Sequence, residues 1–275
     1  MTDHRGLQRG LFRMQMDPAF ARRVFARDEG ATASLELREP DLALLLALDP
    51  VAVAADAHDR RKDQLLGNLA SEYGLSVVVG PDELLAGFLS SREFHEAIRG
   101  DGLLPSAFGA YAARIADERG DDSLGALIAL EREMVALRRR ARDAAARKPR
   151  DEAEPLLRLS PRAALVSLRA GTLAWAAALR DALRMGTPRP TPDLGEGEER
   201  VLLLAEPSSP HALPDVRPEV LEPAVATLLE HARHGLDAAA REALAAELGA
   251  APDELESFAD SLVADGVLIR APDGR

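Results

Sequence analysis

Apolar residues in the first 150 positions recur mainly at helical spacing. The longest such pattern lies in "DDSLGALIALEREMVALRRRARDAAARK", where Leu127, Leu130, Met134 and Leu137 follow one another at steps of three and four. These steps place the four side chains on one face of a helix that packs against neighbours. The proline-containing stretch "KPRDEAEP" follows and interrupts the pattern. We therefore predict a helical domain over residues 1–150.

The hydrophobic pattern changes in the second half of the chain. "LLRLSPRAALVSL" predicts one or two short strands around Ser160–Pro161, and "GTLAWAAALRDALRMG" predicts a helix. Residues 187–199, "TPRPTPDLGEGEE", are rich in proline, glycine and acidic residues and predict a flexible connection. After it, a strand is expected at Val201–Ala205 and a weaker second strand near Ala212–Val216.

Three helices and a last strand are predicted after these strands, at 218–234, 238–248, 253–265 and 267–269. Asp253 and Glu256 have the spacing of a capping box at the start of the third helix. The order β-β-α-α-α-β is typical of a winged-helix module. The predicted fold class is thus α+β, mostly α, with a helical domain at 1–150 and a winged-helix-like module with a small antiparallel sheet at 151–275.

Charge separates the two halves. The whole chain has a formal net charge of −12, from 46 acidic and 34 basic residues. Residues 151–275 hold 22 acidic and 12 basic side chains, a net of −10, so the first 150 residues hold 46 − 22 = 24 and 34 − 12 = 22, a net of −2. The module that resembles a DNA-binding fold is therefore the acidic half, which weighs against nucleic acid as a partner.

Composition narrows the class of protein further. Cysteine is absent, which excludes disulfides, thiolate metal sites and a cysteine nucleophile. The longest aliphatic run, "LALLLAL", is far shorter than the roughly 20 residues that cross a bilayer, and the N-terminal residues show no export signal. We expect a soluble, cytoplasmic protein without a membrane partner.

Catalytic chemistry is hard to find in the sequence. It contains no GxGxxG, GxxxxGK[ST], HExxH or GxSxG motif. His231 and His234 have a spacing that allows shared metal binding on a helix, and His95 lies between two glutamates. A histidine pair near a helix C-terminus is also common without any metal. No catalytic residue and no metal ligand is assigned, and no cofactor is expected in this chain.

Two stretches carry a resemblance to a known family. One is "DAHDRRKDQLLGNLASEYGLSVVV" with the later "FLSSREFHEAIRGDGLLPSAFGAY". The other is "RVLLLAEPSS" with the later "LLEHARHGLDAAAREALAAELGAAPDELESFADSLVADGVLI". Together they resemble the partner proteins of multinuclear non-haem iron-dependent oxidases in ribosomal-peptide biosynthesis, of the methanobactin and thiaglutamate types. The second stretch is similar to a RiPP recognition element, the module that binds the precursor peptide in the biosynthesis of ribosomally synthesised and post-translationally modified peptides (RiPPs).

The resemblance implies a non-catalytic subunit of an oxidase complex. The helical half would dock on a TIM-barrel oxidase that holds the iron, as a heterodimer, and the C-terminal module would bind the leader of a precursor peptide. An extended leader would add a strand to an exposed sheet edge while the oxidase modifies core residues, often cysteines. The acidic module would favour a basic leader.

Specific residues follow from this interpretation. The peptide-binding candidates are an edge strand and one face of the last helix: Val201, Leu202, Leu203, Leu204, Ala205, Leu255, Phe258 and Leu262. The candidates for the interface with the oxidase are Asn68, Glu72, Phe94, His95, Phe108 and Tyr111. In both sets, packing in the core is the competing interpretation.

Three other functions stay open. A winged-helix transcriptional regulator is the main alternative, although its last helix would carry five acidic residues and no basic one. A stand-alone metal enzyme would use His95 or the pair His231 and His234. A purely structural helical adaptor would need no site of its own.

Overall fold

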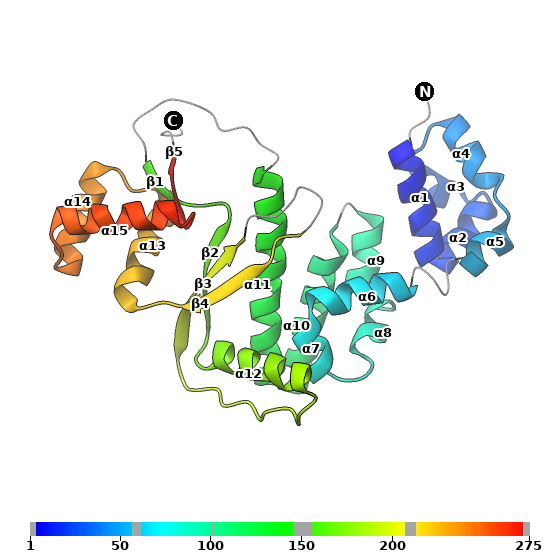
Figure 1. Cartoon of the computed structure of the whole chain (residues 1–275). Coiled ribbons are helices and arrows are strands. Elements are labelled where there is room, and N and C mark those ends of the chain that lie inside the picture. The colour runs from blue at the N-terminus through cyan, green and yellow to red at the C-terminus, as the bar shows by residue number, and fades with distance from the viewer. Residues whose placement is uncertain (1–3, 57–61, 101, 146–155, 207–212, 272–275) are drawn as a thin grey trace. The chain divides into compact units, whose positions relative to one another are not determined.

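A computed structural model describes residues 4–56, 62–100, 102–145, 156–206 and 213–271. The chain forms two compact units, Met1–Ile115 and Ala116–Arg275. The fold is mostly helical with a small antiparallel component, which confirms the predicted α+β class (Figure 1).

The first unit consists of helices. They are α1 (His4–Met16), α2 (Pro18–Phe25), α3 (Glu29–Ala33), α4 (Glu39–Leu46), α5 (Pro50–Asp56), α6 (Lys62–Glu72), α7 (Gly74–Val79), α8 (Leu84–Phe88), α9 (Arg92–Arg99) and α10 (Leu104–Arg119), whose last residues belong to the second unit. Aspartates begin two of the short helices: Asp17 accepts a hydrogen bond from the Phe20 amide and Asp28 one from the Ala31 amide. Such caps satisfy amide groups that have no partner within the helix.

Aromatic rings form one part of the core of this unit. Phe88 lies in edge contact with Phe94 and with Phe108, with ring centroids 5.3 Å apart in both pairs, and Tyr73 contacts Phe108 at 5.0 Å. Edge-to-face pairs of this kind stabilise a core beyond the area that they bury. A separate apolar cluster around Met14, Phe20, Val24 and Leu45 joins α1, α2 and α4.

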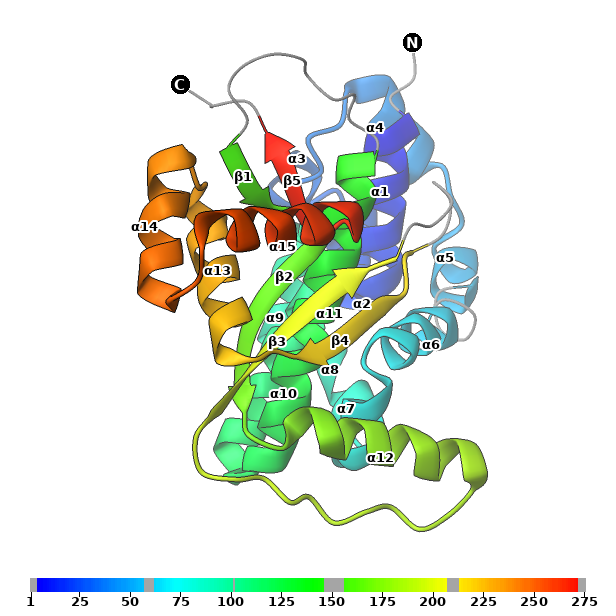
Figure 2. The same ribbon diagram turned by 60° about the vertical axis from the view of Figure 1, so that its left-hand side comes forward.

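The second unit combines helices with five strands. Its elements are α11 (Asp122–Ala145), β1 (Leu156–Leu159), β2 (Ala163–Arg169), α12 (Thr172–Met185), β3 (Glu198–Ala205), β4 (Val216–Val220), α13 (Pro223–His234), α14 (Ala238–Leu248), α15 (Pro252–Ala264) and β5 (Leu268–Ala271). β1 pairs with β5 and forms an isolated bridge from Leu157 to Leu236, and β2, β3 and β4 form an antiparallel sheet in that order (Figure 2).

Helices cover both faces of the three-stranded sheet. On one face, Ala163 and Leu165 of β2 and Leu202 of β3 pack with α13, α14 and α15 in a single apolar cluster. On the other face, Val201 and Leu203 of β3 are fully buried, and α11 contacts all three strands. Side chains alternate between the faces of a strand, so a strand covered on both sides must be apolar at every position.

The two units divide at a different place from the predicted domains. The predicted boundary near 150 lies outside the described residues, whereas the compact units separate between Ile115 and Ala116. The physical reason is that the long helix α11 packs on the sheet of the second unit. Hydrophobic periodicity identified this helix but carries no information about the surface that it packs against.

Local predictions in the second unit were partly right. Helix α14 and both strands around Ser160 are where they were expected, but residues 218–220 belong to β4 and α13 begins only at Pro223. The N-cap residue of α15 is Ala251, whose amide donates to the Glu254 side chain at 3.1 Å, so the predicted capping pair of Asp253 and Glu256 is wrong.

The predicted flexible connection at 187–199 is held at several points. The Trp175 indole donates to the Pro190 carbonyl at 3.1 Å. Glu199 accepts the amides of Gly171 and Leu173 and thereby caps α12, and it belongs to β3. Residues 187–197 form no helix or strand, but side chains at both ends fix their course.

Candidate peptide-binding edges of the sheet

The predicted edge strand is the central strand of the sheet. β3 pairs with β2 through the register Val201↔Val166 and with β4 through the register Val201↔Val220. The Ala205 amide donates to the Arg162 carbonyl on one side, and the Leu221 amide donates to the Arg200 carbonyl on the other. The prediction that Val201–Ala205 receives a peptide is therefore wrong, because both sides of this strand are already hydrogen-bonded.

The side chains of the predicted peptide site lie mainly in the core. Within 201–205, Val201, Leu202, Leu203 and Ala205 are buried, and Leu204 is partly buried against the same apolar cluster as Leu202. On α15, Leu255 is buried and Leu262 is partly buried, so both pack inside the module. Phe258 differs, since 40% of its surface is exposed. Of this set, only Phe258 presents a large apolar surface to solvent.

The sheet has two outer edges, which the register defines. In an antiparallel ladder, residues alternate between facing the partner strand and facing away from it. The bonds around β3 place the backbone groups of Ala163, Leu165 and Ser167 on the outer side of β2, the β2 edge. In the same way, the hydrogen bonds between β3 and β4 place the backbone groups of Val216, Pro218 and Val220 on the outer side of β4, which we call the β4 edge.

Arginine side chains occupy the acceptors of the β2 edge. Arg140 of α11 donates to the Pro161 carbonyl at 3.1 Å and to the Ala163 carbonyl at 2.9 Å. Arg233 of α13 donates to the Leu165 carbonyl and forms an ion pair with Glu230 at 3.0 Å. Charged side chains are one of the means by which proteins close the edge of a sheet.

A groove runs beside the same edge. It has a volume of about 910 Å³, and Arg140, Arg233, Glu133 and Asp143 contribute two positive and two negative groups to its lining. The backbone of Ala163–Leu165 forms part of its wall. Since the two arginines bind carbonyl groups of this wall, an extended peptide would have to displace them before it paired with β2.

The β4 edge is different. Its three outward-facing residues carry three carbonyls and, because proline has no amide hydrogen, two amides, those of Val216 and Val220. Among the described residues, none of these five groups has a recorded hydrogen bond. Val220 is 53% exposed. The edge thus offers both donors and acceptors, together with an apolar side chain.

Pro218 explains how a proline-rich strand fits into the sheet. It lies opposite Leu203, and the bonds on either side of this pair direct its nitrogen away from β3. Proline is tolerated at such a position because no ladder donor is lost. β4 therefore keeps a regular ladder on the side that faces β3, despite its proline.

Three of the six residues predicted to meet an oxidase are buried. Phe94, Phe108 and Tyr111 belong to the aromatic core of the first unit, with exposed fractions of 1%, 0% and 7%. Their surface is used in packing, so the prediction that they form an interface is wrong. Large aromatic rings remove much apolar surface from water when they are buried, which favours their use in the core.

The other three residues lie at or near the surface. Asn68 and Glu72 of α6 line a largely apolar groove of about 450 Å³, together with the half-exposed Leu103. His95 is partly exposed, and its Nδ1 lies 3.9 Å from Asp17 Oδ2. Beside it on α9, Glu93 accepts a hydrogen bond from Arg114 at 2.8 Å, which holds the pKa of this carboxyl below its usual value.

No group of three or more potential metal ligands occurs in the described part of the chain. His231 Nε2 lies 3.9 Å from Glu247 Oε2, and both side chains are about half exposed. Over the same residues, no helix is long and apolar enough to cross a bilayer.

In a comparison with known proteins, no family model matches the chain and no curated protein matches it. The site must therefore be interpreted from its own geometry.

Proposed function

We propose that this chain is a non-catalytic partner of an iron-dependent oxidase and that it binds the leader of a ribosomally made precursor peptide. The leader adds a strand to the β4 edge of the sheet. The oxidase supplies the iron and modifies residues in the core of the peptide, which the bound leader keeps close to the metal. No chemical step is assigned to the present chain.

The open β4 edge is the observation that carries this proposal. Strand addition needs unpaired amides and carbonyls on an accessible edge, since the main-chain hydrogen bonds provide most of the affinity. The outward groups of Val216, Pro218 and Val220 are unpaired among the described residues, and the edge is accessible at Val220, half-buried at Pro218 and buried at Val216. Those of β3 are paired, and the carbonyls of Ala163 and Leu165 in β2 are bound by arginines. The proposal thus keeps strand addition but moves it by one strand.

The oxidase side of the proposal rests on the sequence resemblance and on one surface. The groove that contains Asn68 and Glu72 is lined mainly by the stretch that resembles the oxidase partners, with Arg9 and Phe12 of α1 added, and its lining is mostly apolar. Apolar surface surrounded by polar side chains is typical of protein interfaces. Phe94, Phe108 and Tyr111 act only as the core beneath this surface.

Two measurements test the function. An oxidase gene and a short peptide gene are sought beside the gene of this chain, and their products are co-expressed with the tagged chain. The proposal expects co-purification of an iron-containing heterodimer, and absence of such genes would count against it. A fluorescein-labelled synthetic peptide of the leader should then bind the purified chain with saturable anisotropy, and a core-only peptide should not. Binding of a DNA duplex at physiological salt without leader binding would instead support a transcriptional regulator, and iron retained by the isolated chain would support an enzyme.

A further inference from the structure

The first unit contains a small cavity whose lining is strongly cationic. It has a volume of about 170 Å³ and lies where α1 meets the segment after α3 and the end of α9. Arg9, Arg13 and Arg99 line it, and Glu36 is the only acidic residue in its lining. In a chain with a net charge of −12, the convergence of three arginines on one cavity needs a physical reason.

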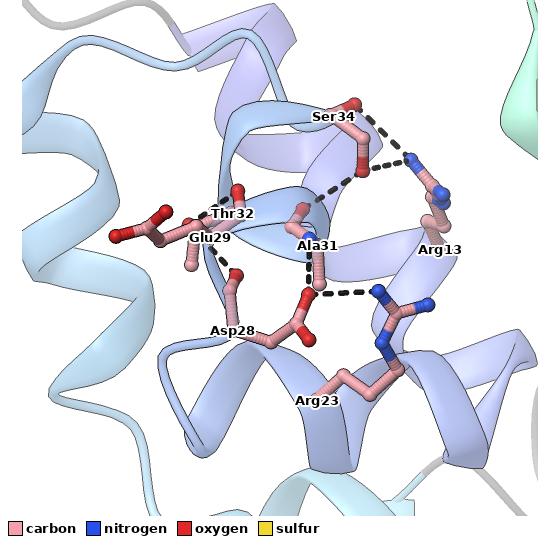
Figure 3. A network of polar contacts seen from close by, with 7 residues as sticks. All are labelled: Arg13, Arg23, Asp28, Glu29, Ala31, Thr32 and Ser34. Carbon is pink, nitrogen blue, oxygen red and sulfur yellow. Dashed lines mark hydrogen bonds and ion pairs between the residues drawn. The ribbon is translucent and has the colours of Figure 1, made fainter.

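Part of this reason is structural, and it concerns Arg13. Its Nη1 donates to the carbonyl and to the hydroxyl of Ser34, at 3.1 Å in both cases (Figure 3). Ser34 is the C-cap of α3, so Arg13 gives a hydrogen-bond donor to the carbonyl at the end of this helix. Its guanidinium also lies over the Phe20 ring, 3.6 Å from the centroid. These contacts fix the guanidinium in place. However, the buried Nε atom of Arg13 has no hydrogen-bond partner among the described residues.

The charges around the cavity do not balance. Glu36 lies 4.0 Å from Arg9, and their side chains are 82% and 50% exposed. Arg99 is exposed as well, so water weakens both the attraction and the repulsion among these charges, and Arg13 is the most buried cation of the group. The pKa of Arg13 is lowered, first by burial and then by the repulsion of Arg99, although Asp17 acts in the opposite direction. A lowered pKa means that this environment disfavours the cation. An anion bound in the cavity would reverse that effect.

We propose that this cavity binds a phosphate group. Three guanidinium groups and one carboxylate leave a formal charge of 3 − 1 = +2, which matches the charge of about −1.5 to −2 on a phosphate monoester better than that of a single carboxylate. The planar fork of arginine suits phosphate oxygens. The volume admits a phosphate group with a few waters. This inference does not depend on the peptide-binding proposal.

The test is a ³¹P NMR titration of the full-length chain with inorganic phosphate and, separately, with glycerol phosphate, at constant ionic strength in a phosphate-free buffer. Saturable binding is expected for the wild type. Arg99→Gln and Arg9→Gln should each weaken it about tenfold. Arg92→Gln is the matched control, because Arg92 lies on the same helix as Arg99, pairs with Glu96 and does not line the cavity. It should change the affinity by less than twofold.

The outcomes separate clearly. Tighter binding of glycerol phosphate than of inorganic phosphate supports a site for a phosphorylated metabolite, and binding of inorganic phosphate alone supports a site for the free ion. Absence of saturable binding in the wild type overturns the proposal, as does an equal loss in Arg92→Gln and Arg99→Gln. A thermal unfolding curve for each variant shows whether the chain remains folded. Arg13 is not substituted, because its loss would also release Ser34.

Discussion

The two outer edges of the sheet show opposite solutions to one physical problem. Any strand at an edge leaves amides and carbonyls without a partner, and these attract other chains. At the β2 edge, Arg140 and Arg233 reach from two different helices to bind the outward carbonyls of Ala163 and Leu165, and Arg140 also binds the carbonyl of Pro161 just before the strand. At the β4 edge, Pro218 removes one donor and no comparable side chain covers the rest among the described residues.

This difference indicates which edge is available for binding. Closing the β2 edge requires two arginine side chains, each of which loses conformational freedom when it is fixed. The β4 edge has only the proline, which limits the pairing with another strand but does not prevent it. We infer that the fold protects one edge and leaves the other accessible. The predictions below alter the central strand and then each edge.

The largest effect is expected in the central strand. Leu203→Pro removes the amide that faces Ala164 of β2 and replaces a fully buried side chain. We expect the free energy of unfolding to fall by about 4 kcal/mol or more, from a lost ladder bond together with disturbed packing. Urea denaturation measures it. Leu203→Ala, which keeps the amide, is the control, and equal losses in both variants would contradict the register.

A proline on the β4 edge should instead affect binding. The Val220 amide faces outward, so Val220→Pro leaves the ladder with β3 intact but removes a donor to an added strand. We expect leader affinity in the anisotropy assay to fall about tenfold, equivalent to about 1.4 kcal/mol, with a much smaller change in stability.

Two controls sharpen this experiment. Val220→Ala keeps the amide and reports the contribution of the side chain alone. Ser167→Pro removes an outward amide from the β2 edge, because Ser167 lies opposite Arg200 in a pair whose backbone groups face away from each other. If Ser167→Pro weakens leader binding and Val220→Pro does not, the peptide binds at the β2 edge and our choice of edge is wrong.

Removal of a capping arginine should have a smaller effect. Arg140→Met leaves the carbonyls of Pro161 and Ala163 without their donor, and we expect a loss of about 1 kcal/mol in urea denaturation. The newly opened edge should also increase self-association in sedimentation experiments. Arg142→Met, on the same helix and paired with the adjacent Asp143 within the described part of the chain, is the matched control and should change neither property.

The error in the predicted edge strand has an identifiable cause. The stretch "VLLLA" is apolar at every position, which is typical of a strand buried on both faces, and this signal favours a central strand. Its second partner, β2, is separated from it by α12 and by residues 187–197. Local patterns identified the strands, but pairing over such a distance depends on packing that no local pattern contains.

The error in the interface residues has a different cause, because a local pattern was available there. Phe94 and His95 are neighbours in the sequence, yet one is buried in an aromatic cluster and the other is partly exposed. The helical spacing of α9 separates them, and the hydrophobic pattern alone was sufficient to place Phe94 inside. The cavity of Arg9, Arg13 and Arg99 had no such signal, because α1 and α9 lie far apart in the sequence.

The smallest effect concerns the charges on the β4 edge. Arg217 and Glu219 are exposed on the same face of β4, and Arg217 lies 3.6 Å from Glu206. If the leader is basic, as the acidic module favours, Glu219→Gln should weaken its binding about twofold, and Arg217→Gln should strengthen it by a similar factor, since single exposed charges contribute less than 1 kcal/mol. Both differences should shrink when the salt concentration is raised in the anisotropy assay. The opposite order of the two variants would indicate an acidic leader and would still place it at this edge, whereas no change in either variant would place the leader elsewhere.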